Sequence, residues 1–322
     1  MKKITFTLAT VVILYNLGTA QINSDSTNTF NSSDSSVSIN TNQLVVNDSS
    51  KRKPDVKTKK FNCNNNTNCL YNYKPKVDIP VTILGIAGSI TGNLLIGSKS
   101  NSDTATILAL NPQDVIGINR GTVNNYDPNA GPISDYFLYG GFFYGFLALA
   151  DHDMRQDGAK ICLLFLETMA ITGTSYEMTA GLVNKYRPYA YNNDSVLQDG
   201  AYVPVVDIGR RTSYNAKNSF YGGHPSVPAA STFFLASVYA QYHPHSPFRF
   251  VLYGVAVAAT STTAYLRLKG GYHFPTDVAI GVALGTTYGL LIPRLHQCTK
   301  VPGLTMMPLL GRNKGMSFAY TF

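Results

Sequence analysis

The stretch RLKGGYHFPTDVAIG, from Arg267 to Gly281, contains three ionisable residues whose types and spacing could do chemistry. Arg267 is followed six residues later by His273, and His273 is followed four residues later by Asp277. An imidazole can attack phosphorus or transfer a proton, and a carboxylate four residues away near a helix start can hold the ring in its reactive tautomer. A guanidinium offers paired donors to phosphate oxygens. This pattern predicts phosphate chemistry.

Two further stretches carry residues of the same kinds. NKYRPYAYN contains Lys185 and Arg187, and SFYGGHPSVPAAS contains Gly223 and His224 ahead of an apolar segment. Cations gathered at one place form an anion site, and glycines at a helix start let a phosphate approach the backbone closely. With a second histidine, one imidazole can attack phosphorus while the other gives a proton to the departing oxygen.

The elements that must position these residues are apolar segments separated by polar loops. These segments lie near 79–97, 134–150, 160–183, 227–242, 249–266 and 275–293. They predict an all-α fold, a bundle of about six helices. The three polar stretches follow the third segment, precede the fourth, and join the fifth to the sixth. Antiparallel connectivity therefore brings them to one end of an up-and-down bundle.

The three stretches together resemble the signature motifs of the type 2 phosphatidic acid phosphatase family, which shares its fold with bacterial class A acid phosphatases and vanadium haloperoxidases. The family pattern is Lys, six residues, Arg-Pro; then Pro-Ser-Gly-His; then Ser-Arg, five residues, His, three residues, Asp. The sequence supplies Arg187-Pro188, Gly223-His224 and, in register, Arg267, His273 and Asp277. The resemblance covers roughly residues 78–295.

The resemblance implies a role for each matching residue. His273 is expected to be the nucleophile, Asp277 its orienting carboxylate and His224 the general acid. The expected phosphate-binding residues are Arg187, Arg267, Lys185 and Gly223. No metal ligand and no cofactor is expected, and vanadate is expected to inhibit by mimicking phosphate.

The sequence also departs from the family pattern. Ala180 stands where the family has its first Lys, and Lys185 could supply the missing charge. Tyr221-Gly222 replaces the Pro-Ser pair, and Leu266 replaces a Ser.

We therefore expect an exported, metal-independent phosphatase that hydrolyses phosphate monoesters or diphosphates through a phosphohistidine. The expected substrates are phosphorylated lipids such as phosphatidic acid, phosphatidylglycerophosphate, isoprenoid diphosphates or lipid A, with small phosphate esters as the soluble option. Two alternatives are a vanadium-dependent haloperoxidase and a non-enzymatic envelope protein with a degenerate phosphate pocket.

The N-terminal sequence predicts export. Residues 1–20 combine a basic start, an apolar run and small residues before Gln21, which is the pattern of a signal peptide; an uncleaved anchor is the alternative. Residues 21–77 are expected to be a low-complexity flexible segment, in which Cys63 and Cys69 are expected to form a local disulfide. A helical phosphatase domain over 78–299 and a tail over 300–322 that includes a short strand complete the expected organisation.

Composition supports an envelope location rather than nucleic-acid binding. The net charge is +8, charged residues make up 14% of the chain, and there is no Trp. Most apolar segments are short for a bilayer span. Glu167 and Glu177 in the third segment are interpreted as buried hydrogen-bonding partners, with a functional role as the alternative. We expect a bacterial cell-envelope protein, periplasmic or membrane-associated, without all helices spanning. Cys162 and Cys298 could be free or paired.

Overall fold

The structure is a computed structural model that describes residues 70–199 and 201–298, together with the backbone of 304–309 and 315–320. The chain divides into the units Met1–Lys57 and Thr58–Phe322, and all described residues lie in the second. The α-helices are α2 (Pro75–Ser98), α3 (Thr104–Leu108), α4 (Gly117–Arg120), α5 (Ala130–Tyr144), α6 (His152–Gln156), α7 (Gly158–Leu182), α8 (Ile208–Thr212), α9 (Gly223–Tyr242), α10 (Phe248–Lys269) and α11 (Pro275–Leu295). The 3-10 helices are η2 (Pro112–Asp114), η3 (Gly145–Ala150), η4 (Pro188–Tyr191) and η5 (Tyr214–Lys217). The strands are β1 (Ser195–Gln198), β2 (Ala201–Pro204), β3 (Leu304–Leu309) and β4 (Gly315–Tyr320).

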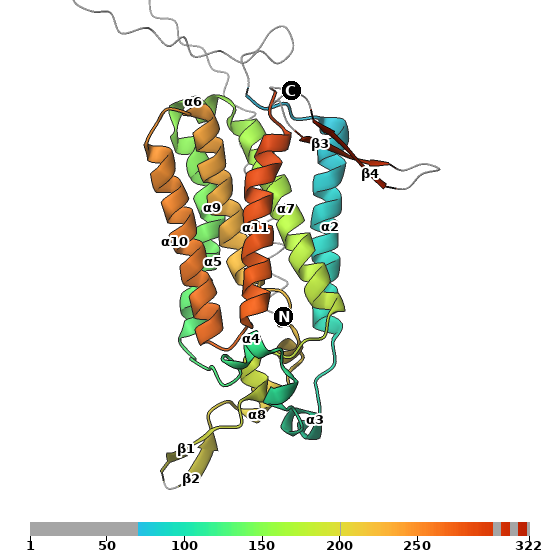
Figure 1. The fold of residues 1–322 in the computed structure, drawn as a ribbon, viewed down its shortest axis with the longest axis vertical. Helices are drawn as coiled ribbons and strands as arrows, with labels where there is room; N and C mark the ends of the chain where they lie inside the picture. Colours follow the sequence, from blue (N-terminus) through green and yellow to red (C-terminus); the bar gives the residue numbers. More distant parts are fainter. Residues whose placement is uncertain (1–69, 200, 299–303, 310–314, 321–322) are drawn as a thin grey trace, which may run out of the picture. The chain divides into compact units, whose positions relative to one another are not determined.

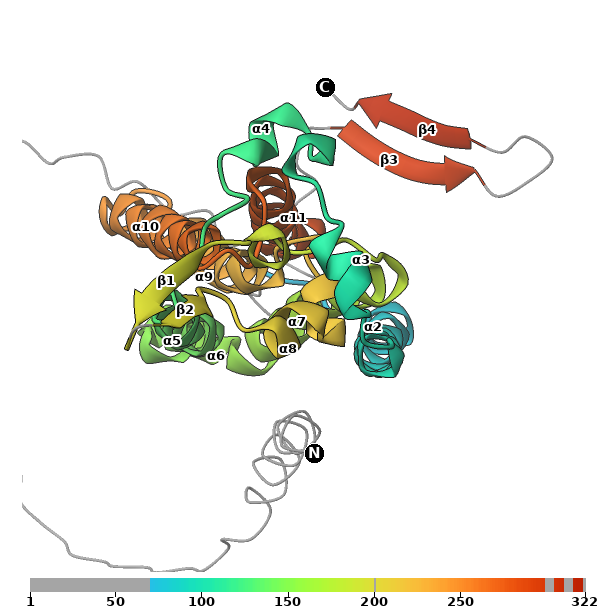
Figure 2. The same ribbon diagram turned by 90° about the horizontal axis from the view of Figure 1, so that it is seen from below.

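The six predicted segments correspond to α2, α5 with η3, α7, α9, α10 and α11, so the all-α bundle is confirmed (Figure 1). Helix α9 lies at the centre and packs against α5, α7, α10 and α11, while α2 packs on α7 (Figure 2). This arrangement explains why α9 buries most of its residues and has almost no polar face. A helix surrounded by four others must be apolar or small on every side.

Glycines bring α9 and α11 into backbone contact. A Cβ at Gly281, Gly285 or Gly289 would lie 2.2–2.4 Å from the carbonyl oxygen of Gly222, Ser226 or Ala230 respectively. These three glycines recur every four residues and therefore share one face of α11. Small residues at this spacing allow two helices to pack closely. The seam fixes the start of α9, with His224, beside the start of α11, with Asp277.

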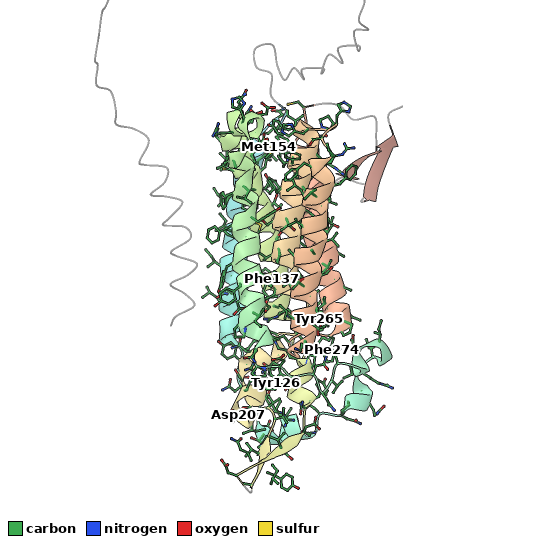
Figure 3. All side chains as sticks on the ribbon, turned by 90° about the vertical axis from the view of Figure 1, so that its left-hand side faces the viewer. Tyr126, Phe137, Met154, Asp207, Tyr265 and Phe274 are labelled. Atoms are coloured by element: carbon green, nitrogen blue, oxygen red, sulfur yellow. The ribbon has the colours of Figure 1, made fainter. Side chains whose placement is uncertain are left out.

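The two ends of the bundle differ in construction. At one end lie the starts of α9 and α11, with the short elements α3, α4 and α8 and the β1–β2 hairpin (Figure 1). We call this the site end; Tyr126 and Phe274 lie there, whereas Met154 lies at the opposite end, the far end (Figure 3). The antiparallel β1–β2 hairpin and α8 were not predicted, because they lie between the third and fourth apolar segments and each is only four or five residues long.

At the far end the start of the described chain is joined to the end of α11. Tyr71 forms a β-bridge with Gln297, and Cys298 N–H donates to Leu70 O at 2.9 Å. Cys298 is disulfide-bonded and Cys162 is free, which settles the question left open for these two. The predicted pair Cys63–Cys69 lies outside the described residues, as do the predicted signal peptide and most of the flexible segment.

The predicted strand in the tail is present as β4, paired with β3 in an antiparallel hairpin. β3 was not predicted.

Large apolar side chains are exposed along the outer helices. Within the described residues, α2 and α11 are long and apolar enough to cross a membrane, with mean hydropathies of 1.7 and 1.5. On α2 the exposed apolar side chains include Ile83, Leu84 and Leu94, at 59–69% exposure. On α5 and α10 they include Tyr136 and Phe250. Two such helices are weak evidence for membrane association, and the exposed side chains on α5 and α10 agree with it.

Candidate active site

His273 lies in the loop that joins α10 to α11, and its side chain is fully buried. The turn that delivers it contains Gly271 at φ +66°, where a Cβ would overlap the carbonyl oxygen of Asn125.

Nδ1 of His273 contacts the carbonyl oxygen of Ser219 at 2.6 Å, so Nδ1 carries the proton and donates it. Nε2 is buried and has no hydrogen-bond partner among the described residues. Burial and the positive charges of Arg267 and Arg187 lower the pKa of His273 well below its usual value. The ring is therefore neutral, with a free lone pair on Nε2.

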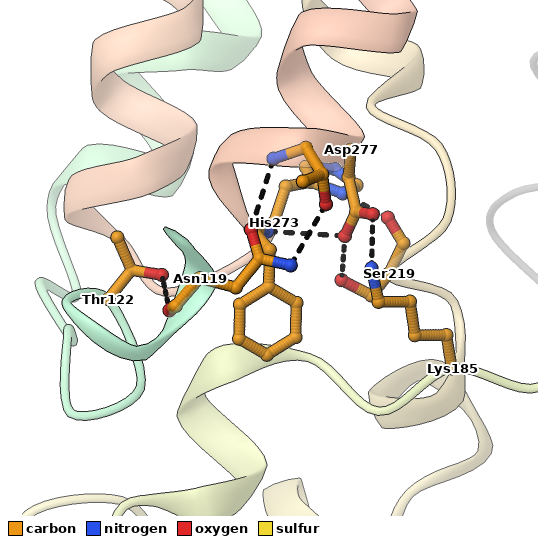
Figure 4. A network of polar contacts seen from close by, with 8 residues as sticks. Asn119, Thr122, Lys185, Ser219, His273 and Asp277 are labelled. Atoms are coloured by element: carbon orange, nitrogen blue, oxygen red, sulfur yellow. Dashed lines mark hydrogen bonds and ion pairs between the residues drawn. The ribbon is translucent and has the colours of Figure 1, made fainter. Parts of the chain in front are cut away.

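The sequence predicts that Asp277 orients His273 directly, but the hydrogen bonds of the Asp277 carboxylate go to other residues. Its carboxylate accepts from Lys185 Nζ at 2.5 Å, from Ser219 Oγ at 2.6 Å and from Phe274 N–H at 3.2 Å (Figure 4). The physical reason is that α11 begins at Pro275, so Asp277 lies in the first turn and its side chain folds back to cap the helix. Asp277 acts on His273 through Ser219, since it holds the residue whose carbonyl fixes the imidazole.

Lys185 has a protein partner that the sequence did not reveal. Its ammonium pairs with Asp277 and lies 5.0 Å from the centre of the Phe274 ring. With the carboxylate fully buried, this pair balances a charge that would otherwise be costly. Lys185 is therefore a partner of Asp277 in this structure, and its role as a phosphate ligand stays a prediction.

The two arginines meet at one tyrosine. The guanidinium carbon of Arg267 lies 3.8 Å from the centre of the Tyr272 ring, and that of Arg187 lies 5.5 Å from it. Arg267 is 3% exposed and donates from Nη1 to Ser134 Oγ at 3.1 Å. Its Nε is buried without a hydrogen-bond partner in the described part of the chain. Burial and the neighbouring Arg187 lower the pKa of Arg267 to about 10, so it stays charged at neutral pH.

His224, in the first turn of α9, has a partner that the sequence did not reveal. Its Nε2 lies 3.0 Å from Oδ1 of Asp135 on α5. Burial and Arg267 lower the pKa of His224 to about 4, while Asp135 acts in the opposite direction. Asp135 also lies 3.9 Å from Arg267 Nη1. The one signal in the sequence was that Asp135 is the only Asp, Glu, Lys, Arg or His in the apolar segment 134–150.

Gly223 is the first residue of α9, and its N-cap Gly222 makes no side-chain cap hydrogen bond. The first N–H groups of a helix have no partner within the helix and attract anions. A Cβ at Gly223 would lie 2.6 Å from the Tyr176 ring, so glycine is required by packing as well.

Lys99 contacts the backbone of Ala180, the residue at which the family Lys would stand. Ala180 is fully buried on α7, and its carbonyl accepts from Lys99 Nζ at 2.5 Å. The same ammonium donates to Val183 O and to Asn218 Oδ1, both at 2.8 Å. Burial, followed by Lys217 and Arg187, lowers the pKa of Lys99 to about 8. Lys99 thus caps the end of α7. Its ammonium also lies close enough to Arg187 for the two positive charges to repel each other.

One end of the helical bundle thus brings together the buried His273, the partly exposed His224 and two arginines, a set of groups suited to binding an anion. Residues 161–299 match the family model of the PAP2 superfamily, which confirms the resemblance of the three motifs and identifies this region as a PAP2 domain. The superfamily indicates phosphatase-type activity. No curated protein and no solved structure matches the chain. Asp135 and Lys99 both lie upstream of the matched residues.

Proposed function

We propose that the protein is a metal-independent phosphatase that acts on phosphate monoesters or diphosphates through a phosphohistidine on His273. One observation carries the proposal: Nε2 of His273 and Nε of Arg267 are both buried and unpartnered among the described residues, at a site with two arginines. An unpaired buried polar group costs about 1–3 kcal/mol. A phosphate group satisfies both at once, because its oxygens accept from arginine while its phosphorus faces the imidazole lone pair.

The first step forms a bond from His273 Nε2 to phosphorus and breaks the bond from phosphorus to the ester oxygen. Arg187, Arg267 and the N-terminus of α9 balance the charge on the phosphoryl oxygens. The departing oxygen receives a proton from His224. Because Nε2 of His224 faces Asp135, the proton comes from Nδ1 of the imidazolium.

The second step returns the enzyme to its starting state. Neutral His224 takes a proton from water as the water oxygen attacks phosphorus, and the bond from phosphorus to His273 breaks. Inorganic phosphate leaves, and both histidines regain their initial protonation. The Nδ1 contact with Ser219 holds the His273 ring in place throughout.

Membrane association and the exposed surface near the site favour lipid substrates. Asn119 on α4 donates to Thr276 Oγ1 at 2.9 Å, which fixes α4 against the start of α11. The same short helix region exposes Ile116 and Ile118 at 69% and 70%. Apolar side chains beside an anion site suit a substrate with a phosphate head and an apolar tail. A bacterial cell-envelope location, reached by export, belongs to this proposal.

The test is phosphate release from an aryl phosphate, phosphatidic acid, phosphatidylglycerophosphate and undecaprenyl diphosphate, with and without chelator. Turnover is expected with chelator present, and His273→Ala is expected to abolish it. Vanadate is expected to compete with the substrate. A phosphoenzyme that forms in wild type and is missing in His273→Ala supports the covalent step. Equal turnover in the two proteins would overturn the proposal, and halide oxidation with vanadate would point to a haloperoxidase instead.

A further inference from the structure

Three ionisable side chains meet at the far end of the bundle, away from the catalytic groups. Asp78 lies in the first turn of α2, Glu167 lies on α7, and His296 follows the last residue of α11. One ligand atom from each lies within 4.8 Å of the other two. Their side chains are 7%, 7% and 12% exposed. The end of α11 is about 30 Å from its start, so the proposed catalytic reaction does not use this cluster.

The contacts within the cluster are ion pairs that are longer than ordinary charge-assisted hydrogen bonds. His296 Nε2 lies 3.4 Å from Asp78 Oδ1 and 3.6 Å from Glu167 Oε2. A charge-assisted hydrogen bond between such groups spans about 2.7–2.9 Å. Ligand atoms at about 2.0–2.2 Å from a tetrahedral zinc ion are separated from each other by about 3.4 Å. The two separations from His296 Nε2 therefore match the edges of a coordination tetrahedron, and the two carboxylate oxygens lie within 4.8 Å of each other.

The other atoms of these side chains are already used in ways that leave the ligand atoms free. His296 Nδ1 donates to Ile292 O at 2.8 Å, which places the lone pair on Nε2, facing the two carboxylates. Asp78 Oδ2 accepts from Lys74 N–H at 2.5 Å, so Oδ1 is left for the cluster. Glu167 Oε2 is buried and accepts no hydrogen bond from any described residue. The interpretation of Glu167 as a hydrogen-bonding partner is therefore wrong for this oxygen.

The environment of the cluster leads to the same conclusion. Two carboxylates and one imidazole lie in a region that is almost closed to water. Buried charges are paired or bind metal ions. His296 presents a single nitrogen to both carboxylates, so it cannot pair closely with each of them.

We propose that Asp78, Glu167 and His296 bind a divalent transition-metal cation, with Zn²⁺ as the best fit to one nitrogen and two oxygen ligands. A water molecule completes the tetrahedron. The ion fastens the start of α2 and the end of α11 to α7. It has a structural role and takes no part in phosphate chemistry.

The test measures zinc on the purified full-length protein after dialysis against chelator, followed by titration with Zn²⁺ and with Mg²⁺. One equivalent of Zn²⁺ is expected to bind and to raise Tm, while Mg²⁺ binds far more weakly. Glu167→Gln keeps the shape of the side chain and is expected to weaken Zn²⁺ binding at least ~100-fold, since even the loss of an outer hydrogen-bond partner costs 10–100-fold. His296→Ala is expected to do the same.

The matched control is His243→Ala. His243 Nε2 pairs with Asp151 Oδ2 at 3.1 Å at the same end of the bundle, in an ordinary ion-pair geometry. Its loss is expected to leave zinc binding unchanged. No bound zinc in wild type, or equal binding in wild type and Glu167→Gln, would overturn the proposal. The comparison of zinc binding by wild type and by Glu167→Gln decides the proposal even if His296→Ala does not fold.

This result is independent of the phosphatase proposal. The zinc-free protein, assayed below its lowered Tm, is expected to keep the turnover number of the zinc-loaded protein. Loss of turnover in correctly folded zinc-free protein would count against metal-independent catalysis, while the zinc site would stand.

Discussion

Replacing Asp135 by Asn tests whether His224 delivers the proton to the departing oxygen. Asp135 and His224 lie 3.0 Å apart, and the aspartate raises the pKa of the imidazole against the opposing effects of burial and Arg267. Asparagine keeps the size of the side chain and removes its charge. The pKa of His224 is therefore expected to fall in the variant.

The size of this fall follows from the contact. A hydrogen bond to a charged group contributes about 1.5–3 kcal/mol. The Asp135 side chain is 46% exposed, so screening by water reduces this to about 1.4 kcal/mol. That is about one pKa unit. At any pH above this pKa the protonated fraction of His224 falls about tenfold, and the rate of an ester that needs the proton falls with it.

The assay is the pH dependence of kcat/KM for two substrates. Activity is lost as pH rises through the pKa of the acid, so Asp135→Asn is expected to move the descending limb about one unit towards low pH with an alkyl phosphate. With p-nitrophenyl phosphate the effect is expected to be small, because the nitrophenolate leaves without a proton. Asp127→Asn is the control, because this substitution removes the same charge from an aspartate that pairs with Lys269 at 2.9 Å and not with His224.

An unchanged descending limb in Asp135→Asn would refute this reasoning. Equal losses for the alkyl and nitrophenyl substrates would also refute it, because Asp135 would then act on binding and not on proton transfer.

Two more substitutions test the packing and the electrostatics of the site. Gly285→Ala is expected to destabilise the protein by about 1–3 kcal/mol, measured as a fall in Tm, because the new Cβ would lie 2.2 Å from Ser226 O. Gly254→Ala, with nothing within 4 Å, is the control and is expected to keep or raise Tm. Lys99→Met is expected to raise KM for phosphate esters about tenfold with a smaller change in kcat, since Lys99 holds Asn218, whose carbonyl oxygen lies 3.4 Å from Arg187 Nε. An unchanged KM would show that Lys99 only caps α7.

Local patterns in the sequence predicted the bundle and brought the right stretches together. The six apolar segments became the six long helices, because length and composition suffice to identify a buried or lipid-facing helix. The third motif predicted that Arg267 and His273 lie near one helix connection, and both lie on or beside the one between α10 and α11. The match over residues 161–299 agrees with this part of the interpretation.

The contacts that the sequence missed are all between distant parts of the chain. Asp135 meets His224 across 89 residues, and Lys99 meets Ala180 across 81. No spacing rule reports such pairs. The error on Asp277 has a different cause: a four-residue spacing predicts contact only inside a helix, and His273 precedes α11. The carboxylate instead forms an ion pair with Lys185, a residue that the sequence predicts to bind phosphate.

The seam between α9 and α11 has a consequence for how this protein could be redesigned. Because backbone meets backbone at Gly281, Gly285 and Gly289, the spacing of α9 and α11 does not depend on any side-chain rotamer at these three contacts. The short elements at the site end are joined to the α10–α11 region by side-chain hydrogen bonds instead, from Arg210 on α8 to Tyr272 and from Asn119 on α4 to Thr276. A redesign that exchanges α4 or α8 must therefore replace these hydrogen bonds, whereas the glycines alone preserve the distance between α9 and α11.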